Sequence, residues 1–460
     1  MNEGITSEQL HRSVKLALDS GEAATLAEAQ RLFQGYRLQI DAGPEIAVSS
    51  TLQAALLTAV NTGRRCFLGG VQIAGALDVP LRVPWRRCRT LAEAVMDLQG
   101  RIVPIIAPAL PRIVFGEPTR TAIDTPFAVS ATFDGWAGGV VPLEGGSRLA
   151  ERQDCPPAGV LAGALAVSEA FQYVRGSNIE AGRRAVGLSL WSPNAALFWQ
   201  DAAAVGPPLE VLPSQLWLIG LGHLGQAYLW TLGFLPYTCP EDVRLVLQDV
   251  DRLAQANDST SPLTNAALLG MKKTRAMANW CEERGFQTKL VERRFAANMR
   301  VDNDEPPIAL CGVDNALARA ALEDVGFRRV VEAGLGKGLH EYLAFQVHTF
   351  PARRLARERW SETEQTEGGI AAPMQPAYQA LADAGLDQCG LTVLAGRSVG
   401  ASFVGTAVAT LVVAELLRMV LGEEQHELID GTLRTPLRRQ TIVATAAREP
   451  FNPGYTLAMR

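Results

Sequence analysis

Apolar and polar positions alternate along the second half of the chain in a way that predicts strands followed by helices. The run QLWLIG at 215–220 is an apolar strand, and Gly222 to Leu232 fits a helix. The same order continues with strands at 243–250, 306–314, 330–336 and 343–350 and helices at 266–284 and 316–325. This alternation predicts an α/β fold with a mostly parallel sheet and helices on both faces.

The first half of the chain repeats this plan in degenerate form. Residues 51–75 read as an apolar helix followed by a β-rich run, the order also found at 223–251. Long helices rich in small residues are predicted at 155–176 and 399–422, and small residues there permit close approach of helix to sheet. We therefore predict an N-terminal helical segment (1–30), a degenerate domain (31–210) and a second domain (211–460).

Composition narrows the class of function. The formal net charge is −5, which argues against a nucleic-acid binder that works by neutralising phosphates. The polar N-terminus lacks the apolar core of a signal peptide. The apolar run 399–413 is shorter than the roughly 20 residues that span a bilayer, so it predicts a buried helix. We expect a cytoplasmic protein that binds neither membrane nor nucleic acid.

The seven cysteines are scattered along the chain and form no C-x-x-C pair. This pattern argues against a disulfide framework and against a four-cysteine zinc site. Any functional cysteine is then expected to act alone, as a reactive thiol.

Three glycines follow the strand at 215–220 with the G-x-G-x-x-G spacing of a nucleotide-binding turn: Gly220, Gly222 and Gly225. Such a turn lets backbone approach a phosphate at a helix N-terminus, but alone it is weak evidence and also fits a plain strand–helix turn. A dinucleotide site places an acidic residue roughly 20 positions further on. Here the acidic pair, Asp249 and Asp251, comes 29 and 31 residues after Gly220. This spacing is long for a dehydrogenase.

The residues after this pair describe a site for ATP. A carboxylate at the end of the second strand can hydrogen-bond ribose, and Lys273 can neutralise phosphate. Asp314, at the end of the next strand, can hold Mg²⁺, a cation that prefers oxygen ligands. Each residue has a structural alternative, since Lys273 also fits a surface helix and Asp314 a helix N-cap.

The ordered set resembles the adenylation domain of ubiquitin-activating (E1) enzymes and their ThiF and MoeB relatives. The set comprises GLGHLG, then DVD, Asn257, GMKK, and VDN with Arg319, and the resemblance covers about residues 211–430. It implies a Rossmann-like fold, with the glycines, Asp249, Asp251, Asn257 and Lys273 around ATP and Asp314 on Mg²⁺. The first half, with no glycine motif and no D-x-D, resembles the inactive adenylation domain of a two-domain E1.

One position departs from the family pattern. The family places an arginine three residues after the asparagine, where this chain has Thr260. In the family an arginine from the partner domain can also reach in, and Arg31 or Arg37 is a candidate here.

An E1 adenylates the C-terminal carboxylate of a ubiquitin-like protein and then transfers the acyl group to a cysteine thiolate. We expect Cys389 to carry the thioester, because it follows the charged crossover loop at about 353–390 and precedes the apolar helix. The alternative for Cys389 is a buried structural cysteine.

The layout is similar to the E1-like component (BilD type) of bacterial ubiquitin-like conjugation, or Bil, antiphage operons. That similarity implies a ubiquitin-like protein and an E2-like conjugating protein as partners, and a homodimer is possible. Three alternatives stay open: an adenylyltransferase for a sulfur-carrier protein, a dehydrogenase, and a scaffold that binds nucleotide without turnover.

Overall fold

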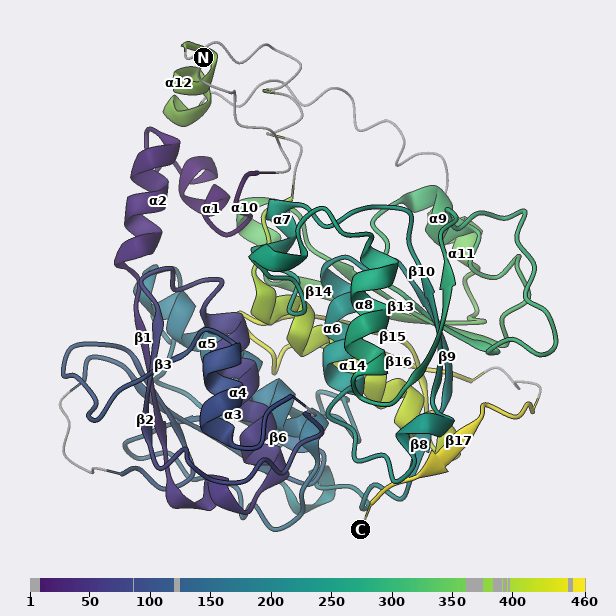
Figure 1. The fold of residues 1–460 in the computed structure, drawn as a ribbon, viewed down its shortest axis with the longest axis horizontal. Helices are drawn as coiled ribbons and strands as arrows, with labels where there is room; N and C mark the ends of the chain where they lie inside the picture. The colour runs from purple at the N-terminus through teal and green to yellow at the C-terminus, as the bar shows by residue number, and fades with distance from the viewer. Residues whose placement is uncertain are drawn as a thin grey trace.

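Two β-sheets, one in each half of the chain, face each other across a layer of helices (Figure 1). The computed structural model describes residues 9–85, 87–119, 125–360, 375–383, 391, 395, 398–445 and 450–459. Short helices α1 (Lys15–Asp19) and α2 (Leu26–Gly35) precede the first sheet.

The first sheet has seven strands in the order β3-β2-β1-β4-β5-β6-β7. The first five strands in this order, from β3 to β5, pair in parallel with their neighbours. Strand β6 pairs antiparallel with both β5 and β7. The strands are β1 (Leu38–Ala42), β2 (Val71–Gly75), β3 (Arg101–Ile102), β4 (Arg112–Phe115), β5 (Ala128–Asp134), β6 (Ala137–Pro142) and β7 (Val186–Ser189). The main helices are α3 (Ser50–Gly63), α4 (Leu91–Asp97) and α5 (Pro156–Val174).

The second sheet has eight strands in the order β11-β10-β9-β12-β13-β14-β15-β16. Its strands are β9 (Gln215–Ile219), β10 (Arg244–Gln248), β11 (Gln287–Val291), β12 (Ile308–Cys311), β13 (Arg329–Leu335), β14 (Ala344–Phe350), β15 (His426–Thr432) and β16 (Gln440–Val443). Its helices include α6 (His223–Leu232), α7 (Gln255–Asp258), α8 (Lys273–Glu282), α9 (Ala316–Ala320), α10 (Gly338–Glu341), α11 (Ala356–Arg359), α12 (Pro376–Asp383) and α14 (Ser402–Val420). A small two-stranded sheet joins β8 (Val211–Pro213) to β17 (Tyr455–Leu457).

The two large sheets follow one topology. β1 and β9 take the same place in their sheets, as do β2 and β10, and the final strands of both are antiparallel. Their parallel ladders number four each. The predicted fold class, a Rossmann-like α/β fold repeated in two mostly parallel sheets, is confirmed.

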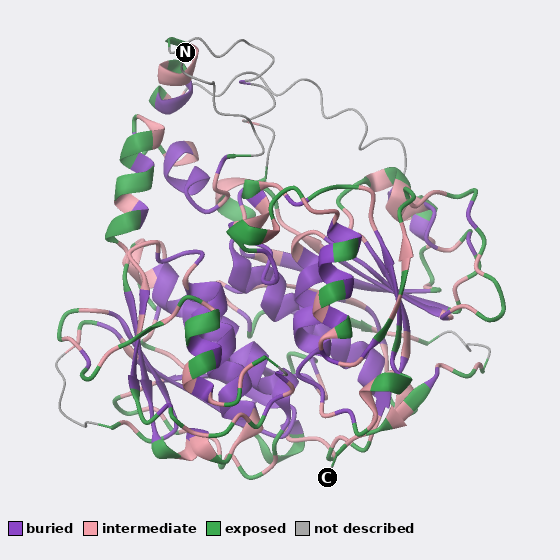
Figure 2. Ribbon diagram, viewed as in Figure 1, coloured by how far each residue is buried: buried purple, intermediate pink, exposed green. Residues whose placement is uncertain are grey.

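The core lies between the sheets, where α3, α5, α6 and α14 form a buried layer (Figure 2). Glycines bring helices together: a side chain on Gly159 or Gly163 of α5 would collide with backbone carbonyls of α3. Gly405 of α14 likewise accommodates the ring of His223 on α6. The sequence predicted that these small residues allow a helix to approach the sheet. In the structure they chiefly allow two helices to approach each other.

The second sheet is covered on both faces. Leu216 and Leu218 of β9 point into the central core, whereas Trp217 and Ile219 join a second cluster beneath α9 and α11. In the first sheet the outer face is polar instead, with a buried ion pair between Arg112 and Asp41. The loops before and after β4 cover this face. Gln39 donates to the carbonyl of Ala107 in the first loop, and the hydroxyl of Thr119 in the second loop donates to Asp41.

Two predicted helices are shorter in the structure. The segment 266–284 is split into a 3₁₀ turn and α8, because Gly270 takes a left-handed φ of +83° between them. The helix expected at 316–325 ends at Ala320, and turns follow it.

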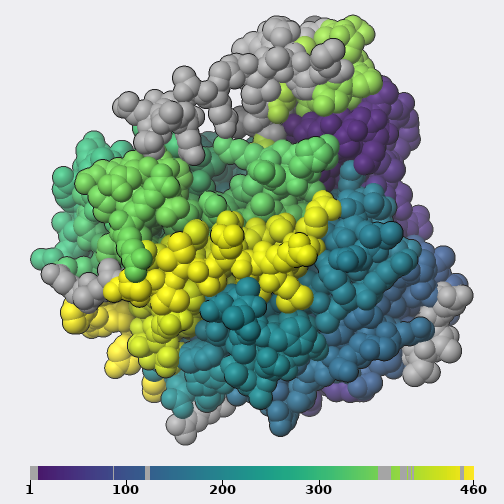
Figure 3. All heavy atoms as spheres, turned by 180° about the vertical axis from the view of Figure 1, so that it is seen from behind, coloured from purple at the N-terminus to yellow at the C-terminus, as the bar shows by residue number. Residues whose placement is uncertain are grey.

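The C-terminal segment ties the halves together on the far side of the molecule (Figure 3). Arg439 donates to the carbonyls of Pro193 and Asn194, and Arg434 donates to the carbonyl of Ser177. The helix α14 is long and apolar enough to cross a membrane by composition, but 89% of its most apolar window is buried inside the protein. It serves here as a core helix.

Candidate adenylation site

The glycine turn connects β9 to α6, and its three glycines do different work. Gly220 has a left-handed φ of +83°, and a side chain on Gly225 would collide with the carbonyl oxygen of Gly220. A side chain on Gly222 would meet no atom within 4 Å. The first and third glycines therefore shape the turn, and the second leaves its outer side open to a ligand.

The N-terminus of α6 opens onto this space. Its N-cap is Gly222, and no side chain caps the helix. The first intrahelical bond is donated by the amide of Gln226 to the carbonyl of Gly222, so the amides before Gln226 have no partner within the helix. Together with the positive end of the helix dipole they suit a phosphate group.

Lys273 lies beside the acidic pair at the end of β10. Its Nζ is 3.0 Å from Asp251 Oδ2 and 3.6 Å from Asp249 Oδ2. Asp249 also accepts from the amides of Leu221 (2.8 Å) and Asp251 (2.8 Å), which fixes the glycine turn to this strand end. The side chain of Asp251 is 60% exposed, so it is the carboxylate that a ligand can reach.

Asp314 lies in the loop after β12, and this loop borders the glycine turn. The neighbouring Val313 packs where a side chain on Gly220 would stand. Arg319 holds the loop, because its Nε donates to the carbonyl of Val313 (2.8 Å) and pairs with the buried Glu332 (3.0 Å). Asp314 is exposed and forms no ion pair with any residue that the structure describes, and Asn315 caps α9 in its place.

Asn257 and Thr260 form a wall of the site that rests on the N-terminal segment. Asn257 Oδ1 accepts from the amide of Ala254 (2.8 Å), so this oxygen serves its own turn. Thr260 is buried, and the amide of Arg12 donates to the neighbouring Ser259 (3.1 Å). The N-terminal segment therefore brings the backbone of Arg12 against the segment that contains Thr260, where the resemblance leaves an arginine missing.

Family models match both halves of the chain. The BilD N-terminal domain matches residues 37–190, and the BilD C-terminal domain matches residues 212–423. The bacterial E1-like protein BilD from Collimonas sp. (strain OK412) is 43% identical over 460 residues, which cover 100% of this chain and 98% of that protein. The chain belongs to the BilD family of bacterial E1-like proteins.

Solved structures are more distant. E. coli tRNA N6-threonylcarbamoyladenosine dehydratase, TcdA, in complex with AMP is 13% identical, with 45% of this chain and 86% of that chain covered and a TM-score of 0.30. The structure of E. coli MccB with succinimide is 10% identical, with 50% of this chain and 63% of that chain covered and a TM-score of 0.31. Nothing about the site of this BilD-family chain follows from similarity at that level.

In the described part of the chain, neither Arg31 nor Arg37 forms a hydrogen bond or ion pair with the residues around the glycine turn, so this expectation stays a prediction. Arg31 is exposed on α2, and Arg37 packs beside Gly69 in the first half. Sequence reasoning missed Arg12 because its contact with Ser259 joins residues 247 positions apart. No local signal marks such a contact, and Thr260 at the family's arginine position indicated only that a phosphate contact is missing or comes from elsewhere.

Two further arginines of the first half, Arg64 and Arg65, were also missed. Arg64 pairs with Asp258 (2.9 Å), and Arg65 donates to the carbonyl of Thr264 (2.7 Å). They anchor the segment that contains Thr260 onto α3. The two halves of this BilD-family chain therefore build this wall together.

Cys389, the candidate nucleophile, and most of the predicted crossover loop lie outside the described residues. Five of the six other cysteines have raised pKa values and so hold little thiolate at neutral pH. Burial raises the pKa of Cys66, Cys155 and Cys311 to about 12, and it also raises that of Cys281. Burial raises the pKa of Cys88 to about 11, and Cys239 is half-buried beside a 3₁₀ turn.

Proposed function

We propose that this BilD-family chain uses ATP to adenylate the C-terminal carboxylate of a ubiquitin-like protein. The observation that carries the proposal is the juxtaposition of the uncapped N-terminus of α6 with Lys273 at one edge of the sheet. Amide donors and a lysine at one place are the elements that bind phosphates. Asp251 would accept hydrogen bonds from the ribose hydroxyls. Asp249 would hold the glycine turn in place beside the ribose, because it accepts from the amide of Leu221.

The reaction needs stabilisation of negative charge rather than a covalent group on the enzyme. An oxygen of the carboxylate attacks the α-phosphorus, a C–O–P linkage forms, and the bond to the β-phosphate breaks to release pyrophosphate. Lys273 and the α6 amides would stabilise the charge that develops on the phosphoryl oxygens. Such preorganised donors typically contribute about 100-fold or more each.

Arg12 would supply the cation that Thr260 does not. The backbone of Arg12 is fixed to Ser259 (3.1 Å), and the hydroxyl of Ser13 donates to the carbonyl of Gly400 (3.0 Å). These bonds hold the N-terminal segment over the wall of the site. A guanidinium there can bind phosphate oxygens through two N–H groups at once.

Asp314 fits a magnesium ion, because it is an exposed carboxylate free of ion pairs within the described part of the chain. Mg²⁺ commonly takes one or two protein carboxylates and completes its shell with water and substrate phosphates. Asp314 would hold the ion, and the bound ion would neutralise charge on the phosphates.

The second step of the proposal is thioester formation at Cys389. Its thiolate would attack the acyl carbon, AMP would leave, and the thiol proton would pass to solvent. The buried thiols of Cys66 and Cys311 have raised pKa values, so they form little of the thiolate that this step needs. This supports the choice of a cysteine other than these. An E2-like protein in the cytoplasm would then accept the acyl group, and the chain could act as a monomer or a homodimer.

Pyrophosphate exchange with a candidate ubiquitin-like protein tests the first step. We expect exchange by the wild-type chain and a loss of about 100-fold or more in Asp314→Asn. Asp324→Asn is the matched control, because Asp324 is an exposed carboxylate on the turn after α9. Binding of ATP without exchange would instead favour the scaffold.

A non-reducing gel tests the second step. A thiol-sensitive adduct that is lost in Cys389→Ser and kept in Cys239→Ser supports an E1 with a cysteine thioester. Exchange without any adduct supports the adenylyltransferase that serves a sulfur-carrier protein. An adduct that persists in Cys389→Ser would contradict the assignment of the nucleophile.

A further inference from the structure

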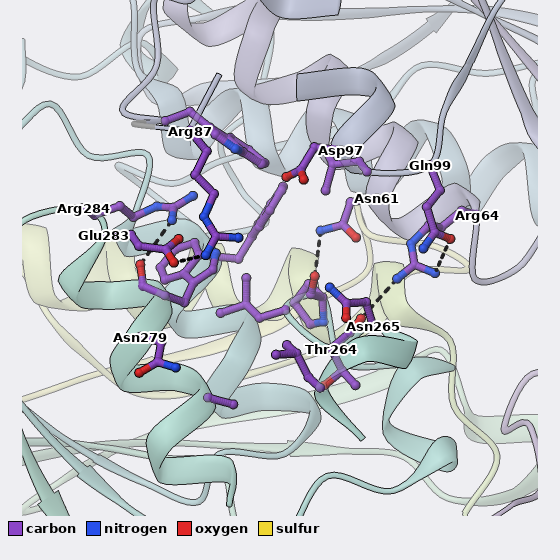
Figure 4. A pocket seen from close by; sticks show the side chains of 18 of the residues that line it. Asn61, Arg64, Arg87, Asp97, Gln99, Thr264, Asn265, Asn279, Glu283 and Arg284 are labelled. Carbon is purple, nitrogen blue, oxygen red and sulfur yellow. Dashed lines mark hydrogen bonds and ion pairs between the residues drawn. The ribbon is translucent and has the colours of Figure 1, made fainter. Parts of the chain in front are cut away.

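A cleft of about 160 Å³ lies between the two halves (Figure 4). One wall comes from α3 and from the segment around α4, and the other comes from α6, α8 and residues 262–268. Lys273 begins α8, whereas Arg284 lies just beyond its end. At 1.5 Å per residue these two positions are about 16 Å apart along the helix, so Arg284 lies at the opposite end of α8 from Lys273. The cleft shares Arg64, Arg65 and Thr264 with the wall described above.

Three tryptophans line the cleft: Trp85, Trp230 and Trp280. The guanidinium carbon of Arg284 is 3.4 Å from the ring centre of Trp280 and 5.2 Å from that of Trp85. Trp230 is fixed in turn, because its Nε1 donates to the hydroxyl of Thr58 on α3 (3.0 Å). The aromatic walls are therefore held rigidly from both halves.

Positive charge exceeds negative charge around the cleft. Its lining contains four arginines (Arg64, Arg65, Arg87 and Arg284) and two carboxylates (Asp97 and Glu283). Arg64 and Arg65 pair with Asp258, and Arg87 pairs with Glu283 at the rim.

Arg284 is 7% exposed and forms no ion pair with a carboxylate in the described ranges. Its Nε has no hydrogen-bond partner there, although Nη1 donates to the carbonyl of Trp280 (3.2 Å). Burial lowers the pKa of Arg284 to about 10, so the group is still charged at neutral pH. A buried charge without a direct ion pair is costly, and an anion in the cleft would offset part of that cost.

We propose that this cleft binds a small aromatic carboxylate, of about the size of benzoate, between the two halves of the chain. A cavity of roughly 150 Å³ holds one benzene ring, so an acid with a single ring matches the volume of this cleft. A planar carboxylate matches the fork of an arginine, and the tryptophans that line the cleft offer apolar contacts to a ring. The exposed side chain of Asn279 also lines the cleft.

Binding is measured with benzoate, salicylate and nicotinate on the full chain, without nucleotide, by calorimetry and tryptophan fluorescence. We expect saturable binding with a Kd of about 1 mM or tighter for at least one of them. Acetate lacks the ring and toluene lacks the charge, so both are expected to bind at least tenfold more weakly.

Two variants locate the ligand. Arg284→Met keeps the side-chain volume, removes the charge and should weaken binding at least tenfold. Arg275→Met is the matched control, because Arg275 is exposed on the same helix outside the cleft. If Arg284→Met does not fold, Asn279→Trp fills the cleft from an exposed position of its lining and should abolish binding.

The proposal is overturned if none of the three acids binds saturably. It is equally overturned if the acid that binds does so with unchanged affinity in Arg284→Met, or in Asn279→Trp where the first variant does not fold. Neither result bears on adenylation, because the assay contains no ATP.

Discussion

The two halves of the molecule share a topology but differ at the N-termini of corresponding helices. In the first half, α3 follows β1, and its first amides are bonded to its own chain. Asp154 accepts from the amides of Ser50 (3.3 Å) and Thr51 (3.2 Å), and from the hydroxyl of Ser49 (2.7 Å). In the second half, α6 follows β9 at the same place and has no side-chain cap.

The second helix of each half shows the same contrast. Thr90 and Glu93 form a capping box at the start of α4. Its counterpart α8 starts at Lys273 with no side-chain cap. In the first half, a carboxylate of the protein itself therefore binds the helix N-terminus. In the second half, the uncapped N-terminus can bind a phosphate instead. The comparison shows that the helix N-termini of the first half are capped by its own side chains, whereas the corresponding N-termini of the second half have no side-chain cap.

The largest effect is expected from Gly225→Ala. The new side chain would collide with the carbonyl of Gly220, so the free energy of unfolding should fall by about 3 kcal/mol or more. Urea denaturation measures this loss. Gly222→Ala is the matched control, because its side chain meets open space. We expect it to keep most of its stability and to bind ATP more weakly, and equal stability of the two variants would contradict this account of the turn.

Acidification should destabilise the second half through His223. Burial lowers the pKa of His223 to about 4 from 6.5, so the unfolded chain takes up a proton first as the pH falls. Stability is therefore unaffected by this group above pH 6.5 and decreases toward pH 4, by about 2 kcal/mol at pH 5.

Denaturation at several pH values measures this slope, which His223→Asn should reduce. The first half has the non-titrating Ser50 at the corresponding place at the start of α3. The exposed His340 is the control, because His340→Asn should leave the slope unchanged. The account is wrong if His223→Asn retains the slope of the wild type.

Arg12→Ala tests whether the first half contributes to the chemistry of the second. We expect pyrophosphate exchange to fall about tenfold or more, because a phosphate contact is removed while the backbone bond to Ser259 stays. Arg31→Ala, on the exposed side of α2, should have full activity. Full activity in Arg12→Ala would leave the site wholly within the second half.

The smallest effect is expected from Asp154→Asn in the first half. Loss of its charge at the start of α3 should cost about 1 kcal/mol of unfolding free energy. Asp78→Asn is the control, because Asp78 is an exposed carboxylate in the same half. Exchange activity should stay unchanged in both, and a loss of exchange in Asp154→Asn would show that the capped helix is not merely structural.

Much of the fold could be predicted from the sequence, because strands and helices follow local periodicity. The strand at 243–250 and the helix at 155–176 match β10 and α5 closely. The same reasoning failed across Gly270, since a single left-handed residue ends a helix that the apolar pattern would continue. Boundaries of this kind depend on one backbone angle rather than on a pattern.

The site divides in the same way. The sequence by itself determined the glycine turn and brought Asp249, Asp251 and Lys273 into one neighbourhood, since adjacent parallel strands end at one edge. Only the tertiary structure decided that Arg12 lies beside Thr260, that Asp154 closes α3 and that tryptophans from both halves enclose a cleft. These contacts join distant positions, and packing between the halves, rather than local propensity, decides which side chains meet.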